Sequence, residues 1–156
     1  MDEKRIKYIV LLIFIVSVLI CLIVYRDTSK LTNIDVDDLT ETEDMDFEVE
    51  NISVGSPETI IEGWALYPNG LITSWDMQVV LYNSEKDEYV GLPTRMSFRD
   101  DVAANYPSGN QYSYSGFYAK AITNRIISVD VEYEICIVYK NNTDKFIVYT
   151  GSYVGR

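Results

Sequence analysis

The chain of 156 residues contains no histidine and only two cysteines. The missing histidine removes the commonest general base and the commonest zinc ligand of proteins. Two cysteines cannot hold together a small disulfide-rich scaffold. Positive charge is also scarce, because 13 Lys and Arg stand against 24 Asp and Glu and the net charge is −11. Such an acidic chain repels phosphate backbones, so nucleic-acid binding is not expected.

Charge and hydropathy divide the chain into three parts. Residues 1–30 carry five bases and three acids, residues 31–50 carry nine acids and no base, and residues 51–156 carry twelve acids and eight bases. We therefore expect a cytoplasmic stub and transmembrane signal anchor in residues 1–26, an acidic linker in 27–46, and an extracytoplasmic domain in 47–156. A domain of that length buries enough apolar surface to fold without disulfides.

The transmembrane prediction depends on residues 9–24, where Ser17 and Cys21 are the only weakly polar side chains. A helix over residues 8–25 is roughly 27 Å long at about 1.5 Å per residue, close to the ~30 Å hydrocarbon core of a bilayer. Tyr8 and Tyr25 border the run, and tyrosine suits both membrane interfaces. Three bases precede the run and two follow it, which favours a cytoplasmic amino terminus and a single-pass protein of the cell membrane.

Three alternatives fit the apolar run less well. A cleaved signal peptide has an apolar region of about 7–15 residues and a small-residue cleavage site, whereas this run is longer and Tyr25-Arg26-Asp27-Thr28 offers no such site. A lipoprotein signal needs small residues before its cysteine, but Leu19 and Ile20 precede Cys21. A buried helix of a soluble domain normally keeps one polar face, and this run has none.

The acidic residues 27–46 are predicted to be an unpacked spacer. Aspartate and glutamate alternate there with threonine and few large apolar groups, a composition that does not offset the entropy of the chain. Clustered carboxylates are also ligands for calcium. The stretch from Asp35 to Thr40 nevertheless lacks the glycine and the ligand spacing of an EF-hand loop, so no metal site is expected.

From residue 47 onward the pattern predicts an all-β fold. Apolar residues alternate, and turn residues follow, in five segments: 47–54, 59–66, 75–82, 89–98 and 131–139. A further strand follows a hairpin loop at 141–144, Pro68-Asn69-Gly70 marks a turn, and the alternation breaks near Glu50. Short strands rich in tyrosine and β-branched residues indicate an antiparallel sandwich. In residues 99–107 we expect one short helical turn with Asp100 as its N-cap.

Three motifs in this region resemble a known family. They are Gly63-Trp64-Ala65, Arg99-Asp100-Asp101-Val102-Ala103 and Ser115-Gly116-Phe117. Their order and spacing resemble a bacterial Ig-like β-sandwich module found in cell-surface, cell-wall and polysaccharide-associated proteins, over roughly residues 50–150. The resemblance implies an Ig-like fold without catalytic residues, in which Arg99 and Asp101 are a structural signature. The family often has proline where this chain has Asp100.

The residues themselves do not form a recognisable catalytic set. The carboxylate pairs Asp100/Asp101 and Asp87/Glu88 are sequence neighbours in predicted turns, unlike the spaced carboxylates of glycosidases. A serine nucleophile lacks its histidine, and Cys136 lies in an apolar strand where a thiol is normally inert. We therefore expect a protein that is not an enzyme and needs no cofactor.

Two functions remain open, together with a third that combines them. The first is an interaction module that binds a partner protein of the cell envelope. The second is a glycan-binding module, because four tyrosines lie within thirteen residues near Arg99 and three of them share one strand parity. The candidate ligand-binding residues are Arg99, Asp101, Tyr106, Tyr112, Tyr114 and Tyr118. The third is an accessory subunit of a polysaccharide-processing system. The structural alternative is that tyrosine is simply a good strand residue.

Overall fold

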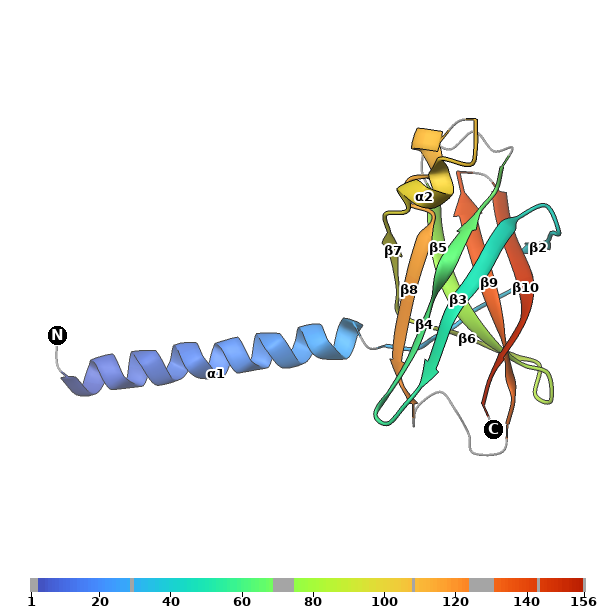
Figure 1. The fold of residues 1–156 in the computed structure, drawn as a ribbon. Helices are drawn as coiled ribbons and strands as arrows, with labels where there is room; N and C mark the ends of the chain where they lie inside the picture. Colours follow the sequence, from blue (N-terminus) through green and yellow to red (C-terminus); the bar gives the residue numbers. More distant parts are fainter. Residues whose placement is uncertain are drawn as a thin grey trace. The chain divides into compact units, whose positions relative to one another are not determined.

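The computed structural model describes residues 3–28, 30–68, 75–107, 109–123, 131–142 and 144–155. It consists of two compact units, residues 1–30 and residues 31–156. The first unit is an apolar helix and the second is built mainly of two β-sheets (Figure 1). Residues 69–74 lie outside the described part of the chain, and they include Asn69 and Gly70 of the turn predicted at residues 68–70.

The first unit contains helix α1 (Glu3–Thr28). Its segment Lys4–Tyr25 has a mean hydropathy of 3.1, and none of that segment is buried within the protein. Leucine, isoleucine and valine line every face of the helix, so it has no polar face to turn toward water. The helix is long and apolar enough to cross a membrane, although an amino-terminal signal sequence has the same properties.

The second unit contains two sheets whose strands follow the predicted alternation. The six-stranded sheet has the order β1-β6-β5-β9-β10-β2, and the four-stranded sheet has the order β3-β4-β8-β7. Every described pair is antiparallel except β2 with β10. The strands are β1 (Thr32–Asn33), β2 (Thr40–Glu41), β3 (Asp46–Val54), β4 (Glu58–Leu66), β5 (Trp75–Asn83), β6 (Glu88–Gly91), β7 (Thr94–Ser97), β8 (Gly116–Ile122), β9 (Tyr133–Asn141) and β10 (Asp144–Val154).

The main core lies between the two sheets, in a sandwich-like arrangement. Alternate residues of β5 and β9 face β4 and β8, and their side chains are almost completely buried: Met77, Val79, Leu81, Ile135, Ile137 and Tyr139 from the larger sheet, and Ile61, Ala65, Phe117 and Ala119 from the smaller one. These are the residues that period-two alternation places on one face of each strand. The break in alternation near Glu50 is a β-bulge, because the register of β3 against β4 shifts between Val49 and Asn51.

The segment 89–98, expected to be one strand, is two strands in different sheets. β6 ends at Gly91 in the six-stranded sheet, and β7 begins at Thr94 in the four-stranded sheet. Leu92 and Pro93 form the corner between them. Pro93 has no N–H to donate to a ladder, which ends the pairing of β6. The alternation of residues continues through the corner, so the sequence pattern alone did not reveal it.

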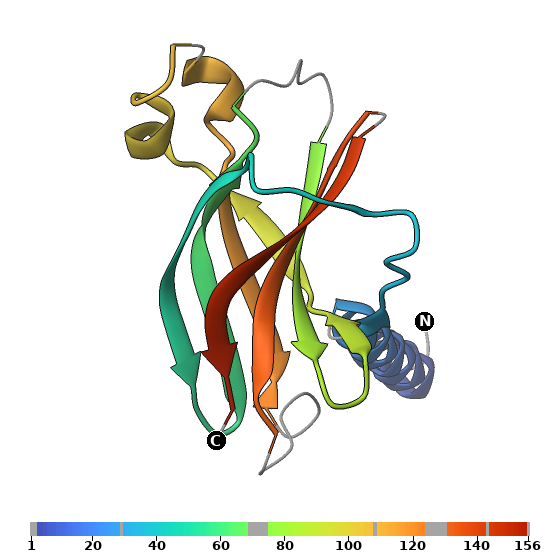
Figure 2. The ribbon, with the colours of Figure 1, turned by 90° about the vertical axis from the view of Figure 1, so that its right-hand side faces the viewer.

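Residues 31–44, most of the predicted spacer, are packed on the six-stranded sheet, and we call them the strap. β1 pairs with β6 at one edge of this sheet and β2 pairs with β10 at the opposite edge, so the strap crosses between the two edges (Figure 2). Ile34, Val36 and Leu39 pack on a second apolar cluster outside the main core. The expectation of an unpacked linker is therefore wrong for these residues, because three apolar side chains among the acids suffice to dock them.

A helical corner closes one end of the β unit. Helix α2 (Asp100–Ala103) is the predicted helical turn, but its N-cap is Arg99, with no side-chain capping bond, and Asp100 is the first helical residue. A 3-10 turn, η1 (Gly109–Tyr112), was not predicted. Val102, Ala103 and Tyr112 pack with Leu66 in a small third cluster, against which Trp64 and Tyr106 also lie. This cluster fixes the corner to the end of β4.

Candidate functional site

Arg99 lies between two carboxylates at the start of the helical corner, and we call Glu50, Arg99 and Asp101 the arginine clamp. Its Nη1 and Nη2 donate to Glu50 Oε2 and Oε1 at 2.7 and 2.8 Å. Its Nε and Nη2 donate to Asp101 Oδ1 and Oδ2 at 2.9 and 2.7 Å. Both carboxylates are thus bound in the bidentate mode that the guanidinium group favours. The clamp joins β3 to α2 across 49 residues of sequence.

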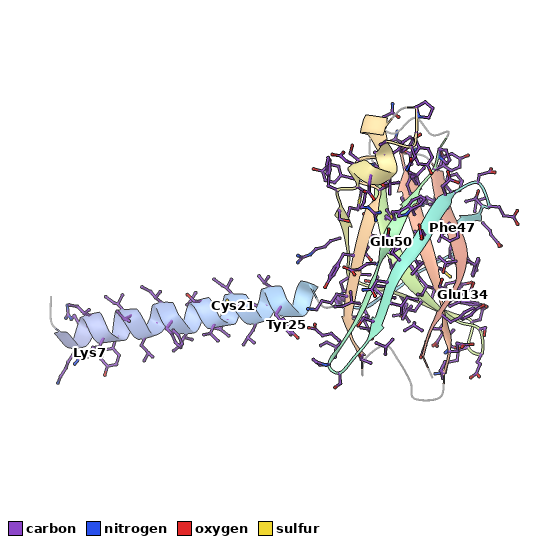
Figure 3. The ribbon with its side chains drawn as sticks, viewed as in Figure 1. Lys7, Cys21, Tyr25, Phe47, Glu50 and Glu134 are labelled. Carbon is purple, nitrogen blue, oxygen red and sulfur yellow. The ribbon has the colours of Figure 1, made fainter. Side chains whose placement is uncertain are left out.

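The local sequence explains how the clamp forms. Glu50 occupies the bulge of β3 (Figure 3), where the register against β4 shifts. The Arg99 N–H donates to the Ser113 carbonyl at 2.7 Å, which fixes the backbone of Arg99. Gly116 lies beneath the arginine stem, since a Cβ there would be 2.8 Å from Arg99 Cγ and would also overlap the Ser97 hydroxyl. Glycine at 116 is therefore required for this close approach.

The clamp also sets the charge of its members. Hydrogen bonds from the Arg99 guanidinium lower the pKa of Asp101 to about 2. Hydrogen bonds to Asp101 and Glu50 in turn raise the pKa of Arg99 above its usual value. The arginine side chain is 21% exposed, whereas those of Glu50 and Asp101 are 37% and 67% exposed. Outward-facing parts of the two carboxylates thus remain open to solvent beside an arginine that is already satisfied.

A hollow of about 320 Å³ adjoins the clamp. It is lined by Glu50, Asn51, Glu62, Gly63, Ser97, Arg99, Phe117 and Tyr118. Asn51, Glu62 and Tyr118 are cross-strand partners on adjacent strands of the four-stranded sheet. They alternate with the core residues Ile61 and Ala119, so the hollow lies on the outer face of this sheet. The Asn51 amide donates to Glu62 Oε2 at 2.8 Å.

The three motifs that carry the family resemblance meet around this hollow. Gly63 and Phe117 line it beside the clamp. A Cβ at Gly63 would overlap the Glu48 carbonyl oxygen and lie 2.7 Å from the Phe117 ring, so glycine allows β3, β4 and β8 to approach closely. Arg99 and Asp101 do bind each other around the turn, as their spacing predicted.

The four candidate tyrosines do not share one surface. Tyr118 alone lies on a strand and lines the hollow. Tyr112 is buried in η1, and its hydroxyl donates to the Pro68 carbonyl at 2.6 Å. Tyr106 packs on Tyr112, with ring centroids 5.4 Å apart, and donates to Asp46 at 2.8 Å. Its burial and this bond raise the pKa of Tyr106 to about 12.

Tyr114 is the most exposed of the four and lies in a turn. It is 57% exposed and packs edge-on against Phe98, with centroids 5.3 Å apart. The prediction that Tyr112, Tyr114 and Tyr118 share one strand parity is therefore wrong, because η1 and the turn interrupt the strand before Gly116. Two of the tyrosines have clear structural roles at the corner, and the ligand-binding role of the set stays a prediction.

Glu50, Asn51 and Glu62 belong to the site but were not predicted from the sequence. Each is an ordinary polar residue of a predicted strand, and Glu50 lies 49 residues from its partner Arg99. The break in alternation at Glu50 was visible, but a bulge by itself does not say which partner it serves. Bulges often redirect a side chain near a functional site, so the break in alternation is the one signal from which Glu50 could have been found.

A second group of aromatic residues was also not predicted, and we call Tyr82, Tyr89 and Tyr149 the tyrosine cluster. Tyr82 and Tyr89 are ladder partners whose rings stack at 4.5 Å. The Tyr89 and Tyr149 hydroxyls share a hydrogen bond of 2.7 Å, and burial together with this bond raises the pKa of Tyr89. The cluster borders the strap on the outer face of the six-stranded sheet.

The cysteines and the acidic side chains are the remaining candidates for thiol or metal chemistry. In that part of the chain, no group of three His, Cys, Asp or Glu side chains is placed to hold a metal ion. Both cysteines are free, and Cys136 is fully buried. Burial raises the pKa of the Cys136 thiol, which keeps it protonated and unreactive as long as it stays covered.

Comparison with protein-family models, curated proteins and solved structures gives no match to any of the three. The functional proposal therefore depends on the geometry of the chain's own residues.

Proposed function

We propose that the protein is a single-pass, membrane-anchored binding module of the cell envelope, with an Ig-like β-sandwich outside the cytosol and no catalytic activity. One observation carries this proposal: α1 exposes apolar side chains throughout Lys4–Tyr25, while the β unit has a main core of its own. Exposed apolar surface of this extent is unfavourable in water and favourable in lipid. The bases Lys4, Arg5 and Lys7 before the span support a cytoplasmic amino terminus.

Topology labelling in intact cells tests the anchoring and the orientation. A cysteine is placed at Ser84, which is exposed in the turn between β5 and β6, in a full chain carrying Cys21→Ser. The matched control carries Cys21→Ser alone and keeps the buried Cys136. We expect the chain in the carbonate-washed membrane pellet, and labelling of the Ser84→Cys variant by an impermeant maleimide. A soluble chain without its first twenty-odd residues, or labelling only after lysis, contradicts the proposal.

Partner binding is favoured by β3, which lies at the edge of the four-stranded sheet with no further strand beside it among the described residues. β3 is an edge strand of nine residues, and its far end carries Ile52 and Val54, which are 37% and 51% exposed. Exposed edge strands with apolar side chains readily bind a strand of another protein. Crosslinking in intact cells tests this contact, with photoreactive groups at Val54 and, as control, at Glu85 in a turn of the other sheet. Partner adducts from Val54 support the contact, and recovery of the monomer alone contradicts it.

Glycan binding is a second candidate function, and the hollow is the observation that favours it. Tyr118 supplies an aromatic wall, and Asn51, Glu50 and Glu62 supply polar atoms beside it. Because Arg99 already binds two carboxylates, the lining offers mainly hydrogen-bond acceptors and net negative charge. Such a lining suits the hydroxyl groups of a neutral sugar and disfavours an acidic sugar.

Calorimetric titration of the full chain in detergent tests the glycan hypothesis. Neutral oligosaccharides are compared with uronic-acid oligosaccharides, and Tyr118→Ala is compared with Tyr114→Ala, since Tyr114 does not line the hollow. We expect heat only with neutral sugars, and roughly tenfold weaker binding in Tyr118→Ala, in line with a lost stacking contact of 1–2 kcal/mol. Absence of heat at millimolar ligand, or equal losses in both variants, contradicts it.

A further inference from the structure

The strap is held on the six-stranded sheet by few contacts. Its ladders comprise two residue pairs with β6 and two with β10. Two more backbone bonds reinforce them, from the Ile34 N–H to the Tyr89 carbonyl and from the Thr42 N–H to the Ile147 carbonyl, each at 3.2 Å. Between the ladders the contact consists of Ile34, Val36 and Leu39, all only partly buried. Leu31, the first residue of the strap, is also partly buried and packs against the main core.

The surface beneath the strap is as apolar as an interior. Val80, Cys136, Val138 and Ile147 are at most 4% exposed, although they point away from the main core. Gly91 leaves room for the strap, because a Cβ there would be 2.8 Å from Ile34 Cδ1. Central strands that are buried on both faces contain continuous apolar runs, and residues 135–139 of β9 are such a run. The strap thus substitutes for a third layer over this sheet.

Charge opposes the docking of the strap. Six acids and no base occur in residues 31–44, and all six side chains are exposed: Asp35, Asp37, Asp38, Glu41, Glu43 and Asp44. The remainder of the β unit is also net acidic, by fifteen acids to eight bases over residues 45–156. The ion pair between Asp38 and Lys145 spans 3.5 Å between exposed groups, which contributes little.

The carboxy-terminal end of the strap is anchored in the main core. Met45, the next residue, is 4% exposed and belongs to the main core. At the other end, α1 ends at Thr28, only two residues before the strap begins. Because the strap precedes Met45 in the chain, a pull from the amino-terminal side acts on the strap first.

We propose that residues 31–44, with β1 and β2, detach as a unit while β6, β5, β9, β10 and the four-stranded sheet stay folded, so that the strap is a releasable length of tether. Released, its fourteen residues extend up to roughly 50 Å. Detachment also uncovers the apolar face around Cys136 and frees the edges of β6 and β10. The tether role depends on the proposed membrane anchoring, whereas the detachment itself does not.

Thiol labelling of Cys136 tests the detachment in the full chain, in detergent, with Cys21→Ser as background. Rates are measured across a series of urea concentrations below the unfolding transition. If only the strap opens, the labelling rate of Cys136 should depend weakly on urea concentration, because little surface is exposed. If labelling requires global unfolding, the rate should depend steeply on urea concentration. Leu39→Ala and Ile34→Ala are expected to label about 5- to 10-fold faster with the same shallow slope.

Matched controls come from the neighbouring strap residues. Thr40→Ala and Asn33→Ala change exposed side chains of β2 and β1 and are expected to stay within about twofold of the parent. A steep urea dependence in the parent and in all variants, equal to that of global unfolding, overturns the proposal.

Hydrogen exchange gives a second test that needs no variant. The amides of Ile34 and Thr42 are expected to exchange much faster than those in the β5–β9 ladder, and with a smaller urea dependence. Equal protection and equal urea dependence in strap and ladder contradict the proposal. Because these measurements are made in detergent, a failure of membrane anchoring appears separately, in the carbonate wash.

Discussion

The arginine clamp allows a quantitative prediction. Glu50→Gln, Arg99→Met and the double variant together form a cycle that isolates the coupling between the two side chains. Exposed ion pairs contribute about 0.2–1 kcal/mol, and bidentate geometry places a pair at the upper end of that range. With contacts of 2.7 and 2.8 Å and an arginine side chain that is 21% exposed, we expect a coupling of about 1 kcal/mol.

The single variants have different expected costs. Arg99→Met removes the partner of two carboxylates at once and is expected to lower the free energy of unfolding by about 2 kcal/mol. Glu50→Gln leaves Arg99 bound to Asp101 and is expected to cost about 1 kcal/mol. Urea unfolding of the full chain in detergent, followed by tryptophan fluorescence, measures all four corners of the cycle. The coupling is expected to shrink in high salt, because the pair is partly exposed.

The pair Lys120–Glu58 is the internal control for this cycle. It also joins two strands, but it is formed by a single contact of 2.8 Å between side chains that are 45% and 41% exposed. A coupling below about 0.5 kcal/mol is expected there. If the Glu50–Arg99 coupling is within about 0.3 kcal/mol of zero at low salt, the clamp does not join β3 to the helical corner and our reasoning is refuted.

Three further predictions concern single residues of the arginine clamp, the helical corner and the hollow. Because the pKa of Asp101 is lowered to about 2, its stabilising effect is present above about pH 4 and is lost as the pH falls through 2. The difference in free energy of unfolding between the parent and Asp101→Asn should therefore shrink as the pH falls over that window. A constant difference argues against the shift. Tyr112→Phe should cost about 1–2 kcal/mol in urea unfolding, since the Pro68 carbonyl loses its donor, and no cost would show that this bond is weak. Gly63→Ala should cost about 2–3 kcal/mol, because the backbone of β3 blocks the added Cβ, whereas Gly55→Ala, with its nearest contact at 3.3 Å, should cost less than about 1 kcal/mol.

Local patterns predicted most of the strands of the β unit. Alternation placed Met77, Val79 and Leu81 on one face, and the structure confirms that they line the main core. The interruption near Glu50 likewise predicted an irregularity that is present as a bulge. These features follow from residues close together in the sequence, whose side-chain direction is fixed by the period of the strand.

Features that depend on distant pairings were not predictable in this way. The strap looked like a spacer because its composition is acidic, and its docking depends on what the far face of the six-stranded sheet offers. A sign of that face was present in Cys136 and Val138, which are apolar at positions where a solvated sheet face would be polar. The corner at Leu92 and Pro93 was missed because alternation does not report which sheet a strand joins.

The candidate site also combines contacts between residues close in the sequence with contacts between distant residues. Arg99 and Asp101 are two residues apart, so their contact could be predicted from spacing alone. Glu50 and Glu62 join them only through the order of strands in the four-stranded sheet. The tyrosines were misjudged because a single turn of 3-10 helix moves Tyr112 from a supposed strand face into the interior.

The corner of Leu92 and Pro93 has a mechanical consequence. The corner is hydrogen-bonded to both sheets. The Leu92 N–H donates to the Val79 carbonyl of β5 at 2.8 Å, and the Lys120 N–H of β8 donates to the Pro93 carbonyl at 3.1 Å. Sliding of one sheet over the other would break both bonds and expose Leu92, which is now fully buried. The hollow and the strap lie on opposite outer faces of this braced block, so a ligand in the hollow encounters the same surface whether the strap is docked or detached.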